Sequence, residues 1–363
     1  MTVVAHHHRT SRPRRLAGVL GAVLAPALVL AGCGQSAGSG DSGEATTVAV
    51  GSPASISNAP FYIGLERGYF RDERIDLQLQ TFGSASQTIA PLGAGQLQVA
   101  AGSPSAGLYN AIARDVKVKI VADSSHAAEG ASYMALLVRK DLVDSGRFTS
   151  FADLKGLTVA DYGDGGTPHA ALARMAEEGG LTLGDLKRTT LAGPDHVSAL
   201  ENGSIDASIS VEPIVTQAVD SGAAVRFAGT DAVDPGQQIG VLLYGSDFIS
   251  RDPDAAQRFM RAYLRGVRDY NSALQDGKLA GPGSTEIIDI VSKYSKVPAA
   301  TLGKIISHGV DPDGKVNEKS LQADFDFWKS AGLIQGDVDI AGAVDPTFAE
   351  AAVQAMGPYT PAS

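Results

Sequence analysis

The chain has 363 residues, 44% of them hydrophobic and 19% charged, a composition typical of a folded globular protein and long enough for two or three domains. The first 32 residues hold four of the 30 basic residues and no acidic one, so the remainder carries 26 bases and 40 acids, a net charge of −14. Such an acidic surface repels phosphate backbones, which argues against a nucleic-acid partner. The single cysteine, Cys33, excludes an internal disulfide and any multi-cysteine metal site, and we expect neither a metal nor a cofactor.

The N-terminal 32 residues have the pattern of an export signal. A basic stretch at 9–15 precedes an uncharged run at 16–32, which is marginal for a membrane span and typical of the apolar region of a signal peptide. The run ends in Leu30-Ala31-Gly32-Cys33, which resembles the bacterial lipobox. This resemblance implies cleavage before Cys33 and attachment of diacylglycerol to its thiol. A plain secretory signal is the alternative, and Arg14-Arg15 leaves twin-arginine export open beside general secretion.

Residues 33–45 are rich in glycine and serine and predict a flexible tether between the lipid and a folded body. We therefore expect the protein to cross the bacterial cytoplasmic membrane and to stay anchored to its outer face through Cys33. No second apolar stretch approaches 18 residues, so the sequence predicts no further span.

From residue 46 onward, short apolar runs alternate with helical patterns, which indicates an α/β fold with parallel sheets. The first part predicts strands at 47–50, 76–82, 97–101 and 116–122, and helices at 59–67, 87–92 and 104–113. After an apolar run at 133–138 the pattern restarts, with strands at 157–160, 189–191 and 205–209, a helix at 168–178, one ending at 203 and one from 213. A strand at 238–244 precedes a mainly helical remainder.

The restart is an internal repeat. Residues 92–99 match residues 200–207 at an offset of 108, and Pro60 falls on Pro168 at the same offset. The repeat predicts two similar lobes, a first at 46–135 and a second at 136–239, with residues 240–363 returning to the first lobe. Two crossover segments would join the lobes, and a central cleft would lie at the carboxyl ends of both sheets. Such an architecture suits a hinged trap that closes on a ligand.

The segment Asn58-Ala59-Pro60-Phe61-Tyr62 through Gly68-Tyr69-Phe70 resembles the opening helix of a family of substrate-binding proteins. This family serves bacterial ABC importers for nitrate, alkanesulfonates, taurine and thiamine-pyrimidine precursors. Residues 92–101, 151–156 and 205–213 are similar to further family segments, although Gln98 replaces an expected aspartate and Val211 an expected aromatic residue. The resemblance implies a periplasmic-binding-protein-like class II fold and a monomer that delivers a small solute to a permease and its ATPase.

Candidate ligand-binding residues lie in loops that lead into helices at the expected cleft, where backbone N–H groups are unpaired. In the first lobe they are Asn58, Phe61, Tyr62, Ser84, Ser103 and Ser125, and in the second Asp164, Thr167, His169 and Glu212. Each has a structural alternative: the serines and Asn58 are good helix caps, the aromatic residues suit a core, and Glu212 suits a helix N-terminus. His126, beside Ser125, has the same two interpretations.

The same loops contain no lysine or arginine, whereas acids occur at Glu129, Asp161, Asp164 and Asp195, with Glu212 nearby. A carboxylate in the cleft would oppose an anionic ligand unless another group offset its charge. The pattern therefore favours an amine or aminopyrimidine over a sulfonate or nitrate, although backbone N–H groups alone could hold an anion.

Two other functions are open. One is an enzyme on the same scaffold, because a pyrimidine-synthesising branch of the fold exists. That branch is cytosolic and carries a cysteine-rich motif, whereas the sole cysteine here is the expected lipid site, and no catalytic motif stands out. The other is a surface sensor that uses the ligand trap to signal. We expect a binding protein and not an enzyme.

Overall fold

The computed structural model describes residues 44–361. The expected signal peptide, Cys33 and all but the last residues of the expected tether lie outside the described residues. Within the described part, no helix is long and apolar enough to cross a membrane.

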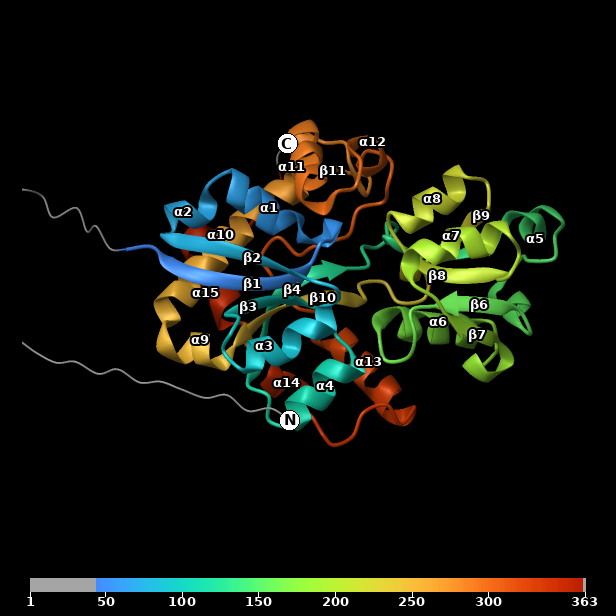
Figure 1. Cartoon of the computed structure of the whole chain (residues 1–363), viewed down its shortest axis with the longest axis horizontal. Coiled ribbons are helices and arrows are strands. Elements are labelled where there is room, and N and C mark those ends of the chain that lie inside the picture. The colour runs from blue at the N-terminus through green and yellow to red at the C-terminus, as the bar shows by residue number, and fades with distance from the viewer. Residues whose placement is uncertain (1–43, 362–363) are drawn as a thin grey trace, which may run out of the picture. The chain divides into compact units, whose positions relative to one another are not determined.

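The first of two five-stranded sheets has the strand order β2-β1-β3-β10-β4. Its strands are β1 (Thr46–Pro53), β2 (Ile75–Phe82), β3 (Val99–Gly102), β4 (Val118–His126) and β10 (Gln238–Gly245). β2, β1 and β3 are parallel, and β10 runs antiparallel between β3 and β4. Lobe 1 denotes the part of the protein built on this sheet (Figure 1).

The second sheet repeats this arrangement with the order β7-β6-β8-β5-β9. Its strands are β5 (Met134–Arg139), β6 (Thr158–Asp161), β7 (Lys187–Thr190), β8 (Ala207–Val211) and β9 (Ala224–Gly229). β7, β6 and β8 are parallel, and β5 runs antiparallel between β8 and β9. Lobe 2 denotes the part built on this sheet, coloured green to yellow in Figure 1.

Helices cover both faces of each sheet. Lobe 2 carries α5 (Lys140–Asp144), α6 (Thr167–Glu178), α7 (Gly193–Glu201) and α8 (Ile214–Asp220). Lobe 1 carries α1 (Ala59–Glu66), α2 (Tyr69–Asp72), α3 (Ile89–Gly93), α4 (Ala106–Ala113), α9 (Ser246–Arg251), α10 (Pro253–Ser272), α11 (Ser284–Ser295), α12 (Ala299–Leu302), α13 (Glu318–Ser330), α14 (Ile340–Ala343) and α15 (Thr347–Met356), with a short hairpin of β11 (Leu274–Gln275) and β12 (Lys278–Leu279). Neighbouring residues of β5 show why both faces must be covered: Leu136 packs into one apolar cluster of lobe 2 and Leu137 into the other.

The α/β class and the two-lobed fold agree with the sequence prediction, and the repeat corresponds to the β2-β1-β3 and β7-β6-β8 triplets. Pro60 and Pro168 both lie in the first turn of their helices, α1 and α6, where a missing N–H does no harm. Pro104 was expected to open a helix, but α4 begins only at Ala106, because Ser105 caps it by accepting a hydrogen bond from the Leu108 N–H. Strand β9 was not predicted.

The chain passes between the lobes twice, at residues 127–133 and 230–237. These two connections bind each other: the Ala127 N–H donates to the Gln237 carbonyl at 2.9 Å, and the Gly130 N–H donates to Asp231 Oδ2 at 2.9 Å. The Ser132 and Thr230 hydroxyls lie 2.7 Å apart. Two short connections held together in this way are the kind of element about which lobes rotate.

Candidate functional site

The lobes contact each other at the carboxyl ends of their parallel strands. Ser105, after β3, forms an isolated β-bridge with Gly166 in the loop between β6 and α6. The Ala106 N–H donates to the Gly165 carbonyl at 2.9 Å. Loops at this edge carry most of the candidate residues, as expected where parallel strands end.

Asn58, Phe61 and Tyr62 are directed into lobe 1. The Asn58 amide donates to the Pro53 carbonyl at 2.7 Å, and its side chain makes no capping bond to α1. Phe61 is 1% exposed and packs in the core against aromatic residues of α10. Tyr62 stacks on Tyr294 of α11 with ring centroids 4.8 Å apart. Each of the three thus has a structural role in lobe 1.

The three candidate serines lie at separate strand ends of lobe 1. Ser84 is partly exposed, and its hydroxyl lies 3.0 Å from that of Ser86. Ser103 donates to the Ile239 carbonyl at 2.8 Å. Ser125 is 2% exposed and its hydroxyl lies 3.4 Å from that of Tyr133, which begins the approach to β5.

Asp164, Thr167 and His169 surround the start of α6. Thr167 is buried and its carbonyl accepts a hydrogen bond from the Gln237 amide at 3.4 Å. His169 is 3% exposed, and its Nδ1 accepts from the Gly165 N–H at 3.1 Å. Burial lowers the pKa of His169, and the nearby Arg188 lowers it further. A neutral His169 therefore holds the glycine loop that meets lobe 1.

Glu212, the leading candidate, is 5% exposed at the end of β8. Its Oε2 accepts from the Thr216 N–H at 3.0 Å and its Oε1 from the Ile306 N–H of lobe 1 at 3.4 Å. Burial raises the pKa of Glu212, while those two hydrogen bonds and the positive charge of Arg226 act in the opposite direction. Glu212 thus acts both as a helix cap and as a contact between the lobes.

Arginines on two strands of lobe 2 lie beside three of the candidate acids, Asp161, Asp164 and Glu212. Arg188 of β7 contacts Asp161 at 2.5 Å and Asp164 at 2.8 Å. Arg226 of β9 lies near Glu212 and donates to the Ser132 carbonyl at 2.6 Å. Sequence reasoning missed both arginines because it examined only the loops, whereas these side chains reach the strand ends from the strands themselves.

A group of polar rings centred on Tyr133 was also missed. The Tyr133 ring packs edge-on against His308, with centroids 5.7 Å apart. Tyr162 lies near enough to Tyr133 to raise the pKa of the Tyr133 hydroxyl. Burial raises the pKa of both tyrosines to about 12, so both hydroxyls keep their protons. The Tyr162 oxygen accepts from the Val211 N–H at 3.4 Å, which leaves its own hydrogen available to donate.

His308 completes this group from the segment after α12. It is 1% exposed, it stacks on Tyr270 with centroids 4.7 Å apart, and its Nε2 is buried without a hydrogen-bond partner among residues 44–361. Burial lowers its pKa to about 3, so the ring is neutral. The signal in the sequence was slight, a histidine in a segment predicted only as mainly helical.

Ser125, Tyr133, Tyr162 and His308 thus come from β4, the first connection, lobe 2 and the C-terminal part of lobe 1. A molecule held among them would contact both lobes at once. A buried polar atom without a partner is rare in folded proteins, and binding sites are one place where it occurs.

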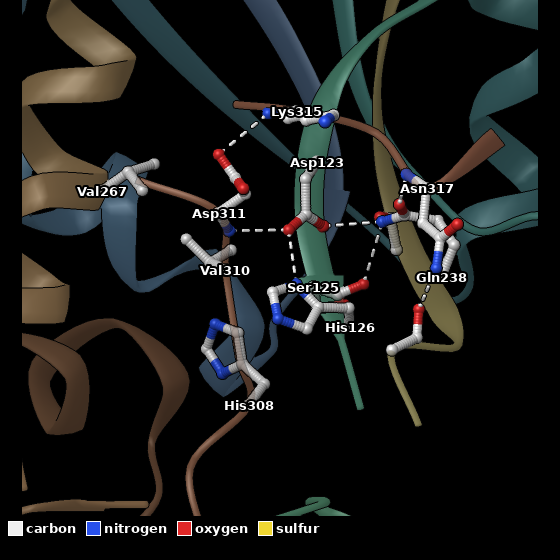
Figure 2. Close-up of polar contacts among 12 residues, drawn as sticks. Asp123, Ser125, His126, Gln238, Val267, His308, Val310, Asp311, Lys315 and Asn317 are labelled. Atoms are coloured by element: carbon white, nitrogen blue, oxygen red, sulfur yellow. Dashed lines mark hydrogen bonds and ion pairs between the residues drawn. The ribbon is translucent and has the colours of Figure 1, made fainter. Parts of the chain in front are cut away.

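His126 lies on the other side of this region, in a hydrogen-bonded network around Asp123 (Figure 2). Asp123 is fully buried; its Oδ2 accepts from His126 Nδ1 and from the Asp311 N–H, both at 2.7 Å, and its Oδ1 accepts from the Gln238 amide at 2.6 Å. Gln238 Oε1 in turn accepts from the Asn317 N–H at 2.8 Å. The network joins the end of β4 and the start of β10, which adjoin the two connections, to the segment that precedes α13.

Two α/β lobes joined by paired connections, with polar groups of both lobes meeting at the strand ends, define the class of two-lobed solute-binding folds. Residues 55–273 match the family described as NMT1/THI5 like, and the chain belongs to this family. This result confirms the family resemblance drawn from the Asn58–Phe70 segment.

A protein of Bacillus subtilis (strain 168), named as an aliphatic sulfonates-binding protein, is 27% identical to this chain over 343 residues. The alignment covers 92% of this chain and 96% of that relative. Among solved structures, the chain resembles the periplasmic aliphatic sulphonate binding protein SsuA of Escherichia coli (TM-score 0.66, 16% identity, 82% of this chain and 97% of that one). It also resembles the periplasmic nitrate-binding protein NrtA of Synechocystis PCC 6803 (TM-score 0.67, 16% identity, 86% of this chain and 90% of that one). A third similar structure is the desulfurization enzyme DszB (TM-score 0.59, 13% identity, 86% of this chain and 99% of that one). At these identities the solved structures establish the shared fold.

Proposed function

We propose that this protein is the solute-binding component of an ABC importer, anchored outside the cytoplasmic membrane through Cys33, and that its ligand is a small organic sulfonate. The observation that carries the proposal is the polar group around Tyr133, to which both lobes and the first connection contribute. A ligand bound there would favour the arrangement in which the lobes meet, as in a hinged trap.

The sulfonate assignment follows from charge and from the named relatives. The sequence favoured an amine because acids stood in the loops without basic residues. In the folded chain Arg188 pairs Asp161 and Asp164, and both oxygens of Glu212 accept from backbone N–H groups. Asp161, Asp164 and Glu212 are therefore engaged by the protein itself, and Glu129 and Asp195 are exposed, so the charge argument for an amine is weakened.

The available donors suit a sulfonate oxygen. Tyr162 has a hydrogen free to donate, and Ser125 and Tyr133 share one contact between two hydroxyls, so one of their hydrogens is also available. Neutral donors can hold an oxyanion in a buried site because they solvate its charge without a counter-charge that would itself need desolvation.

Titration calorimetry with ethanesulfonate, nitrate and a 4-aminopyrimidine, on the wild type and on Glu212→Gln, tests this proposal. We expect ethanesulfonate to bind and Glu212→Gln to bind it equally or more tightly, because a nearby negative charge is removed. If the aminopyrimidine binds instead and Glu212→Gln weakens it by about 1.5–3 kcal/mol, the usual contribution of a hydrogen bond to a charged group, Glu212 recognises an amine and the sulfonate assignment is wrong.

The importer assignment is tested separately from the ligand. Deletion of the gene should abolish uptake of the solute that binds. In the presence of that solute, the purified protein should stimulate ATP hydrolysis by the assembled importer, its permease with its ATPase. Turnover of the solute by the purified protein would instead favour the enzyme alternative. An intact response to the solute without uptake would favour the sensor.

A further inference from the structure

A buried ionic cluster away from the polar group around Tyr133 joins the two lobes. Arg174 of α6, in lobe 2, reaches Asp324 of α13 at 2.6 Å and Asp234 of the second connection at 3.2 Å. The Asp324 side chain is fully buried, and those of Arg174 and Asp234 are 19% and 21% exposed. One guanidinium thus faces two carboxylates with little access to water.

Helix α13 is fixed to lobe 1 and to the second connection. Its Trp328 is fully buried and packs against Tyr109 of α4, with ring centroids 6.0 Å apart. At its N-terminus the Gln238 N–H donates to Ser320 Oγ at 2.9 Å, and Gln238 Oε1 holds the Asn317 N–H, the contact that Figure 2 shows beside Asp123. Because α13 is attached in this way, rotation of lobe 2 would pull Arg174 away from Asp324.

Several polar atoms of the cluster lack a hydrogen-bond partner. Of the buried side-chain nitrogens and oxygens without one in residues 44–361, most belong here: Arg174 Nη1, Asp234 Oδ2, Gln237 Oε1, Asp324 Oδ2 and Trp328 Nε1. Arg174 Nη1 and Asp234 Oδ2 form the 3.2 Å ion pair but no hydrogen bond. A hydrogen bond from the Gln237 side chain to Asp324 favours the ionised carboxylate. Asp324 Oδ2 nevertheless has no hydrogen-bond partner within residues 44–361, and a proton bound there would turn this unpartnered acceptor into a donor.

We propose that Arg174, Asp234 and Asp324 form a proton-dependent latch between the lobes, in which a proton taken from water by Asp324 stabilises the joined arrangement. With both carboxylates ionised the buried cluster carries a net negative charge; with Asp324 protonated it is neutral and gains a donor. The proposal goes beyond solute binding and requires no particular ligand.

The groups that face Asp324 act in both directions, and burial outweighs the rest. Burial and the charge of Asp234 raise its pKa, Arg174 and a hydrogen bond from Gln237 lower it, and the net pKa is about 6 against the ordinary 3.8. Tyr109 of α4 is un-ionised at these pH values, and the residues of α14 carry no titratable side chain. When the lobes separate, water reaches Asp324 and its pKa returns toward 3.8. Protons therefore bind preferentially to the joined state, which gains stability as the pH falls through 6.

The test measures the interlobe distance without ligand. Spin labels at Arg114→Cys in lobe 1 and Glu201→Cys in lobe 2, both exposed, are placed in the full chain carrying Cys33→Ser. Between pH 7.5 and 5.0 we expect the ratio of joined to separated molecules to rise about tenfold, from the two pKa values. In Asp324→Asn the ratio of joined to separated molecules should change less than twofold over this pH range. Asp326 is an exposed acid on the same helix, so in Asp326→Asn the ratio should rise as in the wild type.

A distance distribution in the wild type that does not change between these pH values overturns the proposal, as does an unchanged pH response in Asp324→Asn. If Asp324→Asn does not fold, the same distance measurement on Asp234→Asn tests the proposal. Removal of the neighbouring charge lowers the Asp324 pKa, so the midpoint of the distance change must move to lower pH, and a midpoint that stays in place contradicts the latch.

Discussion

Arg188 Nη2 lies 2.5 Å from Asp161 Oδ2, and Arg188 Nε lies 2.9 Å from the same oxygen. Asp161 is fully buried at the end of β6, so this guanidinium is the main cationic partner of a carboxylate that water does not reach. Loss of one partner of such a pair leaves an uncompensated charge in the interior.

Arg188→Met should therefore lower the free energy of unfolding by about 2–3 kcal/mol, somewhat less than for a fully buried pair because Arg188 is itself 23% exposed. Urea unfolding measures this change. Adding Asp161→Asn should recover part of the loss, since the stranded charge is then removed. Arg251→Met, which breaks an exposed pair with Asp247, should cost less than about 1 kcal/mol; an equal loss in both variants would contradict the account.

Tyr162→Phe should weaken binding of the solute by about 1 kcal/mol, roughly fivefold, while leaving stability nearly unchanged. The reason is that its hydroxyl makes one long hydrogen bond within residues 44–361, at 3.4 Å, in which it accepts, and so keeps a hydrogen for a ligand. Calorimetry and thermal unfolding separate the two effects. Tyr359→Phe, whose hydroxyl lies 3.1 Å from Ser272, is the matched control and should bind normally. Unchanged affinity in Tyr162→Phe would remove this residue from the site.

The stability of the protein should depend on pH partly through His308. Its pKa is about 3 in the folded chain and 6.5 ordinarily, so between these values the unfolded chain binds a proton that the folded chain does not. This contribution therefore decreases as the pH falls, by about 2 kcal/mol between pH 7 and 5. Urea unfolding of the wild type and His308→Gln at both pH values should show that the variant loses about 2 kcal/mol less. Equal losses would mean that His308 titrates normally.

Cys33→Ser should abolish incorporation of a fatty-acid analogue during growth and release the protein from the membrane fraction. Because Cys33 precedes the first strand, which begins at Thr46, the variant should retain the thermal transition of the wild type. Ser36→Ala, three residues further on, is a control that should label normally. Equal labelling of wild type and Cys33→Ser would exclude lipidation at this thiol.

The sequence was most informative where structure is local. The repeat at an offset of 108 predicted three strands of each sheet, because turn residues and apolar runs recur in the same order. It did not reveal β9, a six-residue strand interrupted by Arg226 that forms an edge of its sheet. It also did not reveal that β10 lies between β3 and β4, since this neighbour comes from more than 100 residues away.

The site was less predictable because its groups come together only in the fold. The loop serines and Glu212 were visible as polar residues at strand ends, but their partners were not. Arg226, Tyr133 and His308 lie in a segment to which the sequence assigned no element, in an apolar run and in a region predicted as mainly helical. Their approach depends on how the two connections and the segment after α12 pack, which no local pattern encodes.

The placement of β10 also determines the order in which the protein can be completed. All five strands of lobe 2 come from one continuous stretch, whereas lobe 1 needs residues 238–245 to fill the gap between β3 and β4. While the chain emerges from the ribosome or from the export channel, lobe 2 has its full set of strands first. Until Gly245 follows, β3 and β4 each present an unpaired strand edge, the kind of surface to which other chains add. The half-made protein is thus most vulnerable to aggregation in the lobe that begins first, and a chaperone that shields it must act there until the second lobe has passed.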